Sequence, residues 1–365
     1  MNRRQFLRAG SATALLAVAG CTGADGGATP TAADTPAGAG SETPERANEG
    51  SLPEGVYVQQ FLEGMAMQGT TTQADYGFGL MYAVPHVFWN VTGTQRNRIE
   101  KSGNIHLMTV VWDDKTQMVL PGASVSVTLT RNDELVSQEV IYPMLSQRMG
   151  FHWGGNFRLA SDGEYTARVS VGGLSIRRTG EFEERFSEPV TAEIPVVFNE
   201  EQRSKVTTEP IDEYGQNGAV RPMEMGMIPQ AIAPDRADLP GTLLGETTSD
   251  DAVFRSIYLS GAKANRFGGE EYLAVSARTP YNSLVLPSMG LDATVRRSGT
   301  AVFENTLEPT LDPDLYYHYG TVVDQSLQSG DEVELSVRTP PQLARHEGYE
   351  RAFLQMDESM VVTVP

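Results

Sequence analysis

The chain repeats itself at a fixed offset of 166 residues. Residues 118–121 (Met-Val-Leu-Pro) recur as residues 284–287 (Leu-Val-Leu-Pro), and 287 − 121 = 166. A period of this kind is typical of one structural unit that occurs twice. Further pairs in the same register are His152-Trp153-Gly154 with His318-Tyr319-Gly320, Val87-Phe88 with Val253-Phe254, Thr128 with Thr294, Arg131 with Arg297, and Pro143 with Pro309. Beyond them, Glu164-Tyr165 aligns with Glu332-Val333, so the second copy is predicted to gain two residues.

Each copy shows the alternation of half-buried β-strands. In residues 124–131, Val125, Val127 and Leu129 share one face, while Ser and Thr residues share the other. Residues 164–171 alternate in the same way, and turn-forming Gly, Asn and Asp residues separate the two runs. No stretch of the mature chain has a convincing amphipathic helical pattern. The sequence therefore predicts an all-β protein with two tandem immunoglobulin-like β-sandwich domains.

The N-terminus has the pattern of an export signal. Residues 2–8 (NRRQFLR) carry a twin arginine, and the apolar run 9–20 is too short to span a bilayer. Small residues before Cys21, the only cysteine, resemble a lipobox, which predicts lipidation of Cys21. The following residues lack large apolar side chains and are predicted to form a disordered tether. The expected division is 1–21 signal, 22–50 tether, 51–200 metal-binding domain, 201–221 linker and 222–365 second, degenerate copy.

Net charge limits the partners of the chain. The formal charge of −19 argues against binding to nucleic acid and to anionic lipid. Together with the twin-arginine signal, this charge resembles that of exported proteins of salt-loving archaea, whose acidic surfaces stay solvated at high salt. We expect a protein on the extracytoplasmic face of the cell membrane, held there by its lipid.

Residues 141–156 (IYPMLSQRMGFHWGGN) hold a concentration of soft and borderline metal ligands. Met144, Met149 and His152 fall within nine positions of a chain that has only five histidines. Residues 105–108 (IHLM) would place His106 and Met108 on the same face of a strand. Singly, such residues are usually core side chains; their combination predicts a metal site. His86 is a further candidate, with Met81 before it, and Met65 and Met67 place two thioethers on one side of an extended chain.

Residues 106–171 resemble the periplasmic metal-binding proteins of bacterial high-affinity ferrous-iron uptake. The likeness rests on His106-Leu107 at the head of a strand, on Tyr142-Pro143-Met144, and on residues 152–156 (HWGGN), which are similar to that family's His-Leu-Glu, Met-Pro-Met and His-Tyr-Gly-x-Asn. Residues 162–165 resemble its next turn. The resemblance implies an immunoglobulin-like fold, a copper and/or iron ion held by His106, Met144 and His152, and delivery of iron to a membrane permease.

The chain also departs from that family. Met108 stands where the family has a glutamate ligand, and Trp112 lies near the place of its second strand histidine. A thioether in place of a carboxylate shifts the expected preference toward copper, above all Cu(I). In the second copy, the equivalents of His106, Met108 and Met144 are Tyr272, Ala274 and Thr310, so a structural or partner-binding role is expected there.

Motifs of common enzymes are missing, and the protein is predicted not to be an enzyme. Two other interpretations stay open: a metal-free surface interaction or scaffold protein, and a redox enzyme that uses bound copper. Asn90-Val91-Thr92 is an N-glycosylation sequon, which makes Asn90 a candidate acceptor. A homodimer is compatible with the sequence, which does not decide whether two chains pair.

Overall fold

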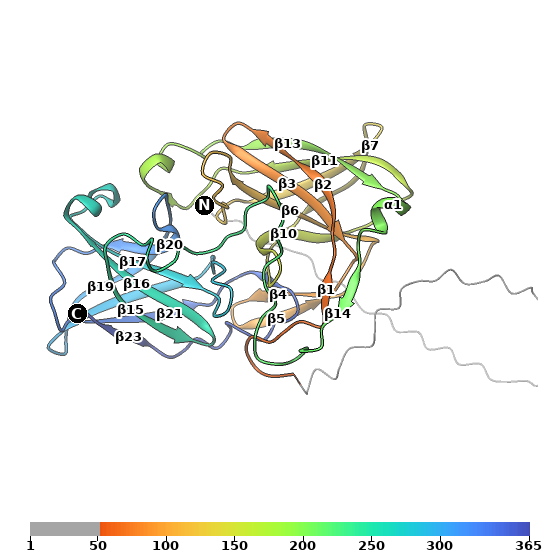
Figure 1. The fold of residues 1–365 in the computed structure, drawn as a ribbon. Helices are drawn as coiled ribbons and strands as arrows, with labels where there is room; N and C mark the ends of the chain where they lie inside the picture. The colour runs from red at the N-terminus through yellow and green to blue at the C-terminus, as the bar shows by residue number, and fades with distance from the viewer. Residues whose placement is uncertain (1–51) are drawn as a thin grey trace, which may run out of the picture. The chain divides into compact units, whose positions relative to one another are not determined.

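Strands dominate the described part of the chain, residues 52–365 of a computed structural model (Figure 1). The expected signal, the tether and Cys21 lie outside the described residues. The all-β prediction is confirmed, and several sheets pack in a sandwich-like arrangement. The described residues belong to one compact unit, so the division into two domains stays a prediction.

An eight-stranded sheet carries most of the predicted site. Its order is β2-β3-β6-β10-β9-β22-β4-β5. All of its strands except β22 come from residues 66–157, whereas β22 comes from near the C-terminus and lies between β9 and β4. The strands are β2 (Ala66–Gln73), β3 (Tyr76–Ala83), β4 (Phe88–Thr92), β5 (Gln95–Ile99), β6 (Ile105–Asp113), β9 (Tyr142–Ser146), β10 (Gly150–Phe157) and β22 (Ala344–Arg345).

A four-stranded sheet in the order β13-β11-β7-β8 faces the eight-stranded one. The alternation predicted for β7 and β11 is confirmed, since Val125, Val127 and Leu129 are buried and the intervening Ser and Thr side chains are more exposed. Tyr82 of β3 packs its ring against Phe198 of β13, which identifies its side of β3 as the sandwich interior. The strands are β7 (Val125–Arg131), β8 (Glu134–Val140), β11 (Gly163–Val171) and β13 (Val190–Phe198).

The second half of the chain folds as a nine-stranded sheet. Its path β15-β16-β17-β20-β19-β18-β21-β23 is joined at β19 by β12. The long β19 pairs with β20 through its C-terminal part and with β18 through its N-terminal part. The strands are β12 (Arg177–Arg178), β15 (Thr242–Ser249), β16 (Ala252–Ser260), β17 (Glu271–Arg278), β18 (Gly290–Arg297), β19 (Thr300–Asp312), β20 (Tyr316–Val322), β21 (Glu332–Thr339) and β23 (Met360–Thr363).

Short elements connect these sheets. Strand β14 (Thr208–Pro210) pairs with β1 (Phe61–Glu63), so part of the predicted linker 201–221 forms a small sheet with the start of the described chain. Helix α1 spans Glu200–Arg203, and 3-10 turns span Gly180–Phe182, Gly261–Lys263 and Asn265–Phe267. Among residues 52–365, we find no helix long and apolar enough to cross a membrane. Asn90 is half-buried in β4 opposite Asn97, and its glycosylation stays a prediction.

Strand register reproduces the 166-residue offset. Trp153 pairs with Thr109 in the first half, and Tyr319 pairs with Val275 in the second; both members shift by 166 (319 − 153 and 275 − 109). The predicted gain of two residues near Glu332 is wrong, because Leu129↔Ala167 and Val295↔Val333 keep the same offset.

One proposed repeat pair does not correspond in the structure. Val253 and Phe254 lie in β16, which pairs with β17 as β3 pairs with β6. Phe88 instead begins β4, which forms a hairpin with β5. The equivalent connection in the second half, residues 261–270, contains two short 3-10 turns and no strand.

Candidate metal centre

Three adjacent strands place predicted ligands on one face of the eight-stranded sheet. Strand register pairs His106 of β6 with Asn156 of β10, and His152 of β10 with Met144 of β9. Directly paired residues of antiparallel strands point to the same side. His106, Met144 and His152 are fully buried. The structure thus brings together the three residues that the family resemblance implied as ligands.

Two further histidines complete the group. His86 lies in the connection between β3 and β4, and its ring centroid is 4.1 Å from that of His106. His346 follows β22, whose parallel pairing with β9 sets Ala344 beside Met144. The backbone N–H of His346 donates to the carbonyl of Leu145 at 3.1 Å. His346 was not predicted from the sequence, and it belongs to the second half of the chain.

The ligand atoms of this group converge. Atoms of His86, His106 and His346 lie within 4.8 Å of one another. Nε2 of His86 is 3.0 Å from Nδ1 of His346, and Nε2 of His346 is 3.3 Å from Sδ of Met144. The ring centroids of His152 and His346 are 5.2 Å apart. We call His86, His106, Met144, His152 and His346 the metal centre.

Hydrogen bonds on the outer side of the rings orient them. Asn156 donates through Nδ2 to the carbonyl of His86 at 3.0 Å, which leaves its Oδ1 to accept from Nδ1 of His106 at 2.8 Å. Nδ1 of His152 donates to the carbonyl of Gly150 at 3.0 Å. With the proton on Nδ1, Nε2 of each ring keeps its lone pair. Among residues 52–365, the Nε2 atoms of His106 and His152 are buried without a hydrogen-bond partner.

His346 has close neighbours at both ring nitrogens. A neutral imidazole carries one proton, so His346 can donate either toward His86 or toward Met144. With Nδ1 of His86 donating to the carbonyl of Val84 at 3.1 Å, the remaining contact brings two lone pairs together. A cation among these atoms would bind both lone pairs and remove that repulsion. The donor set therefore fits a metal ion.

Burial holds His106, His152 and His346 neutral. It lowers the pKa of His152 to about 4, and it lowers the pKa values of His106 and His346 well below 6.5, with the nearby His86 acting in the same direction. Neutral imidazole is the form that binds metals. His86 and His346 are only partly buried, so they form the accessible side of the metal centre.

Gly154 forms the floor of the metal centre. A Cβ at this position would lie 2.8 Å from Nε2 of His106, 3.0 Å from Sδ of Met144 and 3.3 Å from Cγ of Met108. We therefore expect Gly154→Ala to weaken metal binding by about 10- to 100-fold, the range that displacing ligands through their surroundings usually costs.

The neighbouring Gly155 supplies the matched control. A Cβ there would meet Ile141 and Phe157 at 3.6 Å, an ordinary van der Waals distance. Isothermal titration of metal into both variants separates displacement of the ligands from a general effect of the added methyl group. The role of Gly154 is contradicted if Gly155→Ala weakens metal binding as much as Gly154→Ala.

Met108 and Met149, which were predicted as secondary ligands, are not among the five residues of the metal centre. Met108 pairs with Gly154 and lines the floor beside His106. Met149 lies in the turn between β9 and β10, and both Met108 and Met149 pack into the large hydrophobic core. Met144 instead packs with Phe88 in a small cluster at the metal centre. The roles of all these residues as ligands stay predictions.

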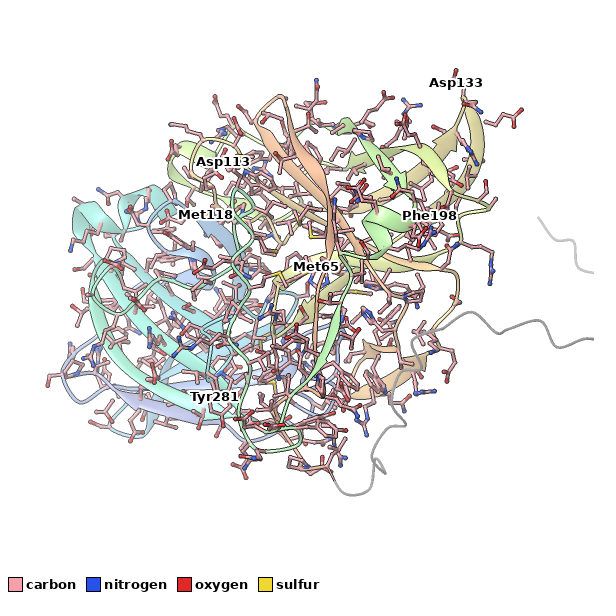
Figure 2. The ribbon with its side chains drawn as sticks, turned by 45° about the vertical axis from the view of Figure 1, so that its right-hand side comes forward. Met65, Asp113, Met118, Asp133, Phe198 and Tyr281 are labelled. Carbon is pink, nitrogen blue, oxygen red and sulfur yellow. The ribbon has the colours of Figure 1, made fainter. Side chains whose placement is uncertain are left out.

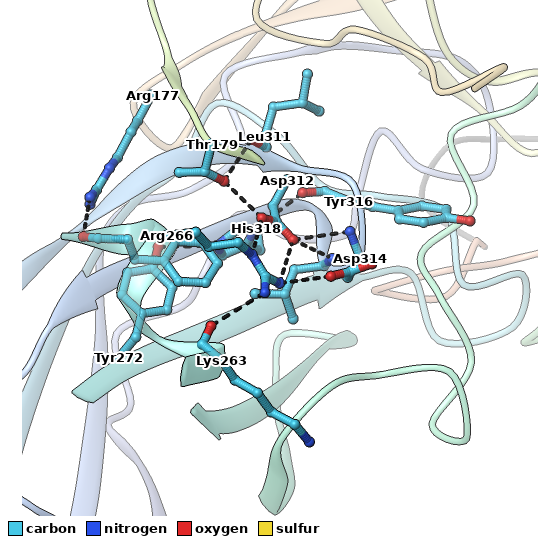
Figure 3. A network of polar contacts seen from close by, with 12 residues as sticks. Arg177, Thr179, Lys263, Arg266, Tyr272, Leu311, Asp312, Asp314, Tyr316 and His318 are labelled. Atoms are coloured by element: carbon cyan, nitrogen blue, oxygen red, sulfur yellow. Dashed lines mark hydrogen bonds and ion pairs between the residues drawn. The ribbon is translucent and has the colours of Figure 1, made fainter. Parts of the chain in front are cut away.

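The equivalent place in the second half is filled by a tyrosine (Figure 3). Tyr272 takes the position of His106, and its Oη lies 3.1 Å from Nε2 of His318. A Cβ on Gly320 would come within 2.1 Å of that oxygen, so the ring occupies the space that Gly154 leaves open in the first half. The Tyr272 ring also stacks on Phe267 at 3.8 Å. His318 is thus a hydrogen-bonded core residue.

An ion-pair network surrounds the position that Tyr272 fills. Asp312 is fully buried and receives two hydrogen bonds from Arg266, at 2.7 and 3.0 Å, and one from Thr179 at 2.8 Å (Figure 3). These bonds lower the pKa of Asp312 although its burial acts in the opposite direction. The charges compensate one another, and the network joins the β12 region to β19.

Comparison with known proteins gives limited similarity. A family model described as a domain of unknown function (DUF7350) matches residues 237–362, which include His318 and His346. No curated protein matches the chain.

Similar solved structures include a copper-bound variant of FetP from uropathogenic Escherichia coli. It shares 15% identity at a TM-score of 0.28, with 37% of this chain and 97% of that chain covered. Another is "as isolated" FetP of uropathogenic E. coli, expressed in the E. coli periplasm, with 15% identity, a TM-score of 0.29 and coverage of 38% and 96%. These scores carry no argument, so the site is assigned from its own geometry.

Proposed function

We propose that the protein binds a copper ion at the metal centre. The observation that carries this proposal is the pair of buried Nε2 atoms, on His106 and His152, that have no hydrogen-bond partner among residues 52–365. Leaving a buried polar nitrogen unpaired costs free energy, about 1–3 kcal/mol for each group. A bound ion would satisfy both atoms together with Met144 and His346.

The chemistry of the ligands favours Cu(I). Imidazole suits several metals, but the thioether of Met144 selects soft ions. Met108 stands where the resembled family has a glutamate. Oε2 of Glu63 approaches His86 at Nδ1, 3.5 Å away, on the ring side opposite Nε2. This carboxylate is placed to orient the imidazole and not to bind the ion.

The cellular setting of the proposal comes from the sequence. The twin-arginine signal and Cys21 support an extracytoplasmic protein held on the membrane by lipid. The family resemblance supports a role in high-affinity iron uptake beside a permease. The metal centre would then bind and deliver a metal ion and would not catalyse a reaction. The ligand set has no carboxylate, which favours copper over iron as the ion held there.

Competitive titration of the purified protein tests the proposal. We expect Cu(I) to bind more tightly than Cu(II), and Cu(II) more tightly than anaerobic Fe(II), because one ligand is a thioether and the others are imidazoles. Tighter binding of Fe(II) than of copper would contradict the assignment of the metal. Binding of none of the three ions would favour the metal-free scaffold interpretation.

A further inference from the structure

A row of methionines crosses the sheet and ends at the metal centre. Strand register pairs Met67 of β2 with Met81 of β3, and Met81 with Met108 of β6. Met108 pairs in turn with Gly154 of β10, over which Met144 also lies. Neighbouring strands are about 4.8 Å apart, so successive side chains of the row are direct neighbours. Met67, Met81, Met108 and Met144 are called the methionine row.

The row leads from solvent to the buried ligands. Met67 is 43% exposed, whereas Met81, Met108 and Met144 are 0–3% exposed. Strand β2, which carries Met67, is the edge strand of the eight-stranded sheet. Met65, labelled in Figure 2, directly precedes this strand; it is partly buried and packs against the core.

The methionines are confined to one face of these strands. The opposite face of β3 and β6 is the sandwich interior, where gap-filling methionines would be expected, yet it carries Phe78, Leu80, Tyr82, Leu107 and Thr109. The histidines of β6 and β10 lie on the methionine-bearing face. Met81 and Met108 also belong to the large hydrophobic core, so they fill core space as well as standing in the row.

We propose that Met67, Met81 and Met108 form a path along which Cu(I) passes between the exposed edge of β2 and the metal centre. The inference rests on the proposed copper-binding function and adds the route of the ion. Each step exchanges one thioether for the next: one copper–sulfur bond forms as another breaks, and copper stays monovalent. Thioethers are soft, polarizable and flexible, which suits this exchange and excludes harder ions from the path.

The test compares rates of metal uptake with affinities at equilibrium. Met67→Leu combined with Met81→Leu keeps side-chain volume and removes two thioethers outside the metal centre. Met289→Leu combined with Met360→Leu, two buried methionines of the second half, is the control. Cu(I) is supplied anaerobically as its bathocuproine disulfonate complex, and loss of the complex is followed by stopped flow.

We expect the Met67/Met81 variant to take up Cu(I) at least about tenfold more slowly than the control, since the first two exchange sites are gone. Its equilibrium affinity for Cu(I) and its rate of Cu(II) uptake should match those of the control. Equal Cu(I) uptake rates would overturn the path and point to access past His86 and His346. A loss of affinity would also overturn it. If the unmodified protein takes up no Cu(I), the proposed function itself fails.

Discussion

His346→Ala is expected to weaken Cu(I) binding by at least about 100-fold, or roughly 2.7 kcal/mol. The ring of His346 contacts both His86 and Met144 through its two nitrogens. Its removal therefore takes away the residue that lies between these two ligands. Changes to residues that only orient the ligands of a metal already cost 10- to 100-fold in affinity, and removal of a ligand should cost no less. Competition with a Cu(I) chelator measures the change.

His318→Ala is the matched control. His318 is fully buried, whereas His346 is partly buried. Both lie in the second half of the chain, but His318 contacts Tyr272 and the carbonyl of Tyr316. This substitution should lower the free energy of unfolding without changing affinity for Cu(I). If the two variants bind Cu(I) equally well, the second half contributes no ligand.

Stability of the metal-free protein should fall steeply as the pH drops from 7 to 5. Burial lowers the pKa values of His152 and His318 to about 4, while the unfolded chain titrates near 6.5. Below 6.5 the unfolded state therefore binds protons that the native state does not, and each residue costs about 2 kcal/mol by pH 5. His106 and His346 act in the same direction. Urea unfolding at the two pH values measures the sum.

The comparison of pH 7 with pH 5 separates the effect of the histidines on the free energy of unfolding from that of Asp113 and Asp312. Hydrogen bonds from Arg185 and Arg266 lower the pKa values of Asp113 and Asp312, so their stabilising effect is lost only in stronger acid. Burial raises the pKa of Glu350, which opposes the loss slightly. His318→Gln should remove about 2 kcal/mol of the fall. Equal free energies of unfolding at pH 7 and pH 5 would show that these histidines are not held neutral.

Local pattern predicted the strands well and the repeat only in part. The alternation in β7 and β11 was sufficient because one face of each strand is buried in the sandwich. The pairing of Val87-Phe88 with Val253-Phe254 failed because two apolar residues match by chance, whereas β4 and β5 form a hairpin that residues 261–270 lack. Hydrophobicity alone does not reveal such an insertion.

The candidate site was predictable where its residues lie on adjacent strands. His106, Met144 and His152 are neighbours through ordinary antiparallel register. His346 depends on β22, a two-residue strand that pairs with β9 and β4 from far along the chain. So short a strand has no periodic pattern. The one available signal was the scarcity of histidine: the chain has five, and four lie at the metal centre.

Met149 shows that proximity in sequence does not fix which side chains meet in the fold. It lies three residues from His152, but Gly150, the first residue of β10, adopts φ +68°. This reversal of the chain places Met144 opposite His152, while Met149 packs into the large core. Spacing along the loop therefore does not decide which of the two thioethers lies beside the histidine.

The most direct measurement is the amount of Cu(I) retained after anaerobic loading and dialysis against a competing chelator. It compares the unmodified protein with the variant His106→Ala plus His152→Ala, which removes the two buried Nε2 atoms that lack a hydrogen-bond partner in the described part of the chain. We expect the unmodified protein to keep a single Cu(I) ion per chain and the variant to keep none. Equal retention by the two proteins would contradict the assignment of this metal centre.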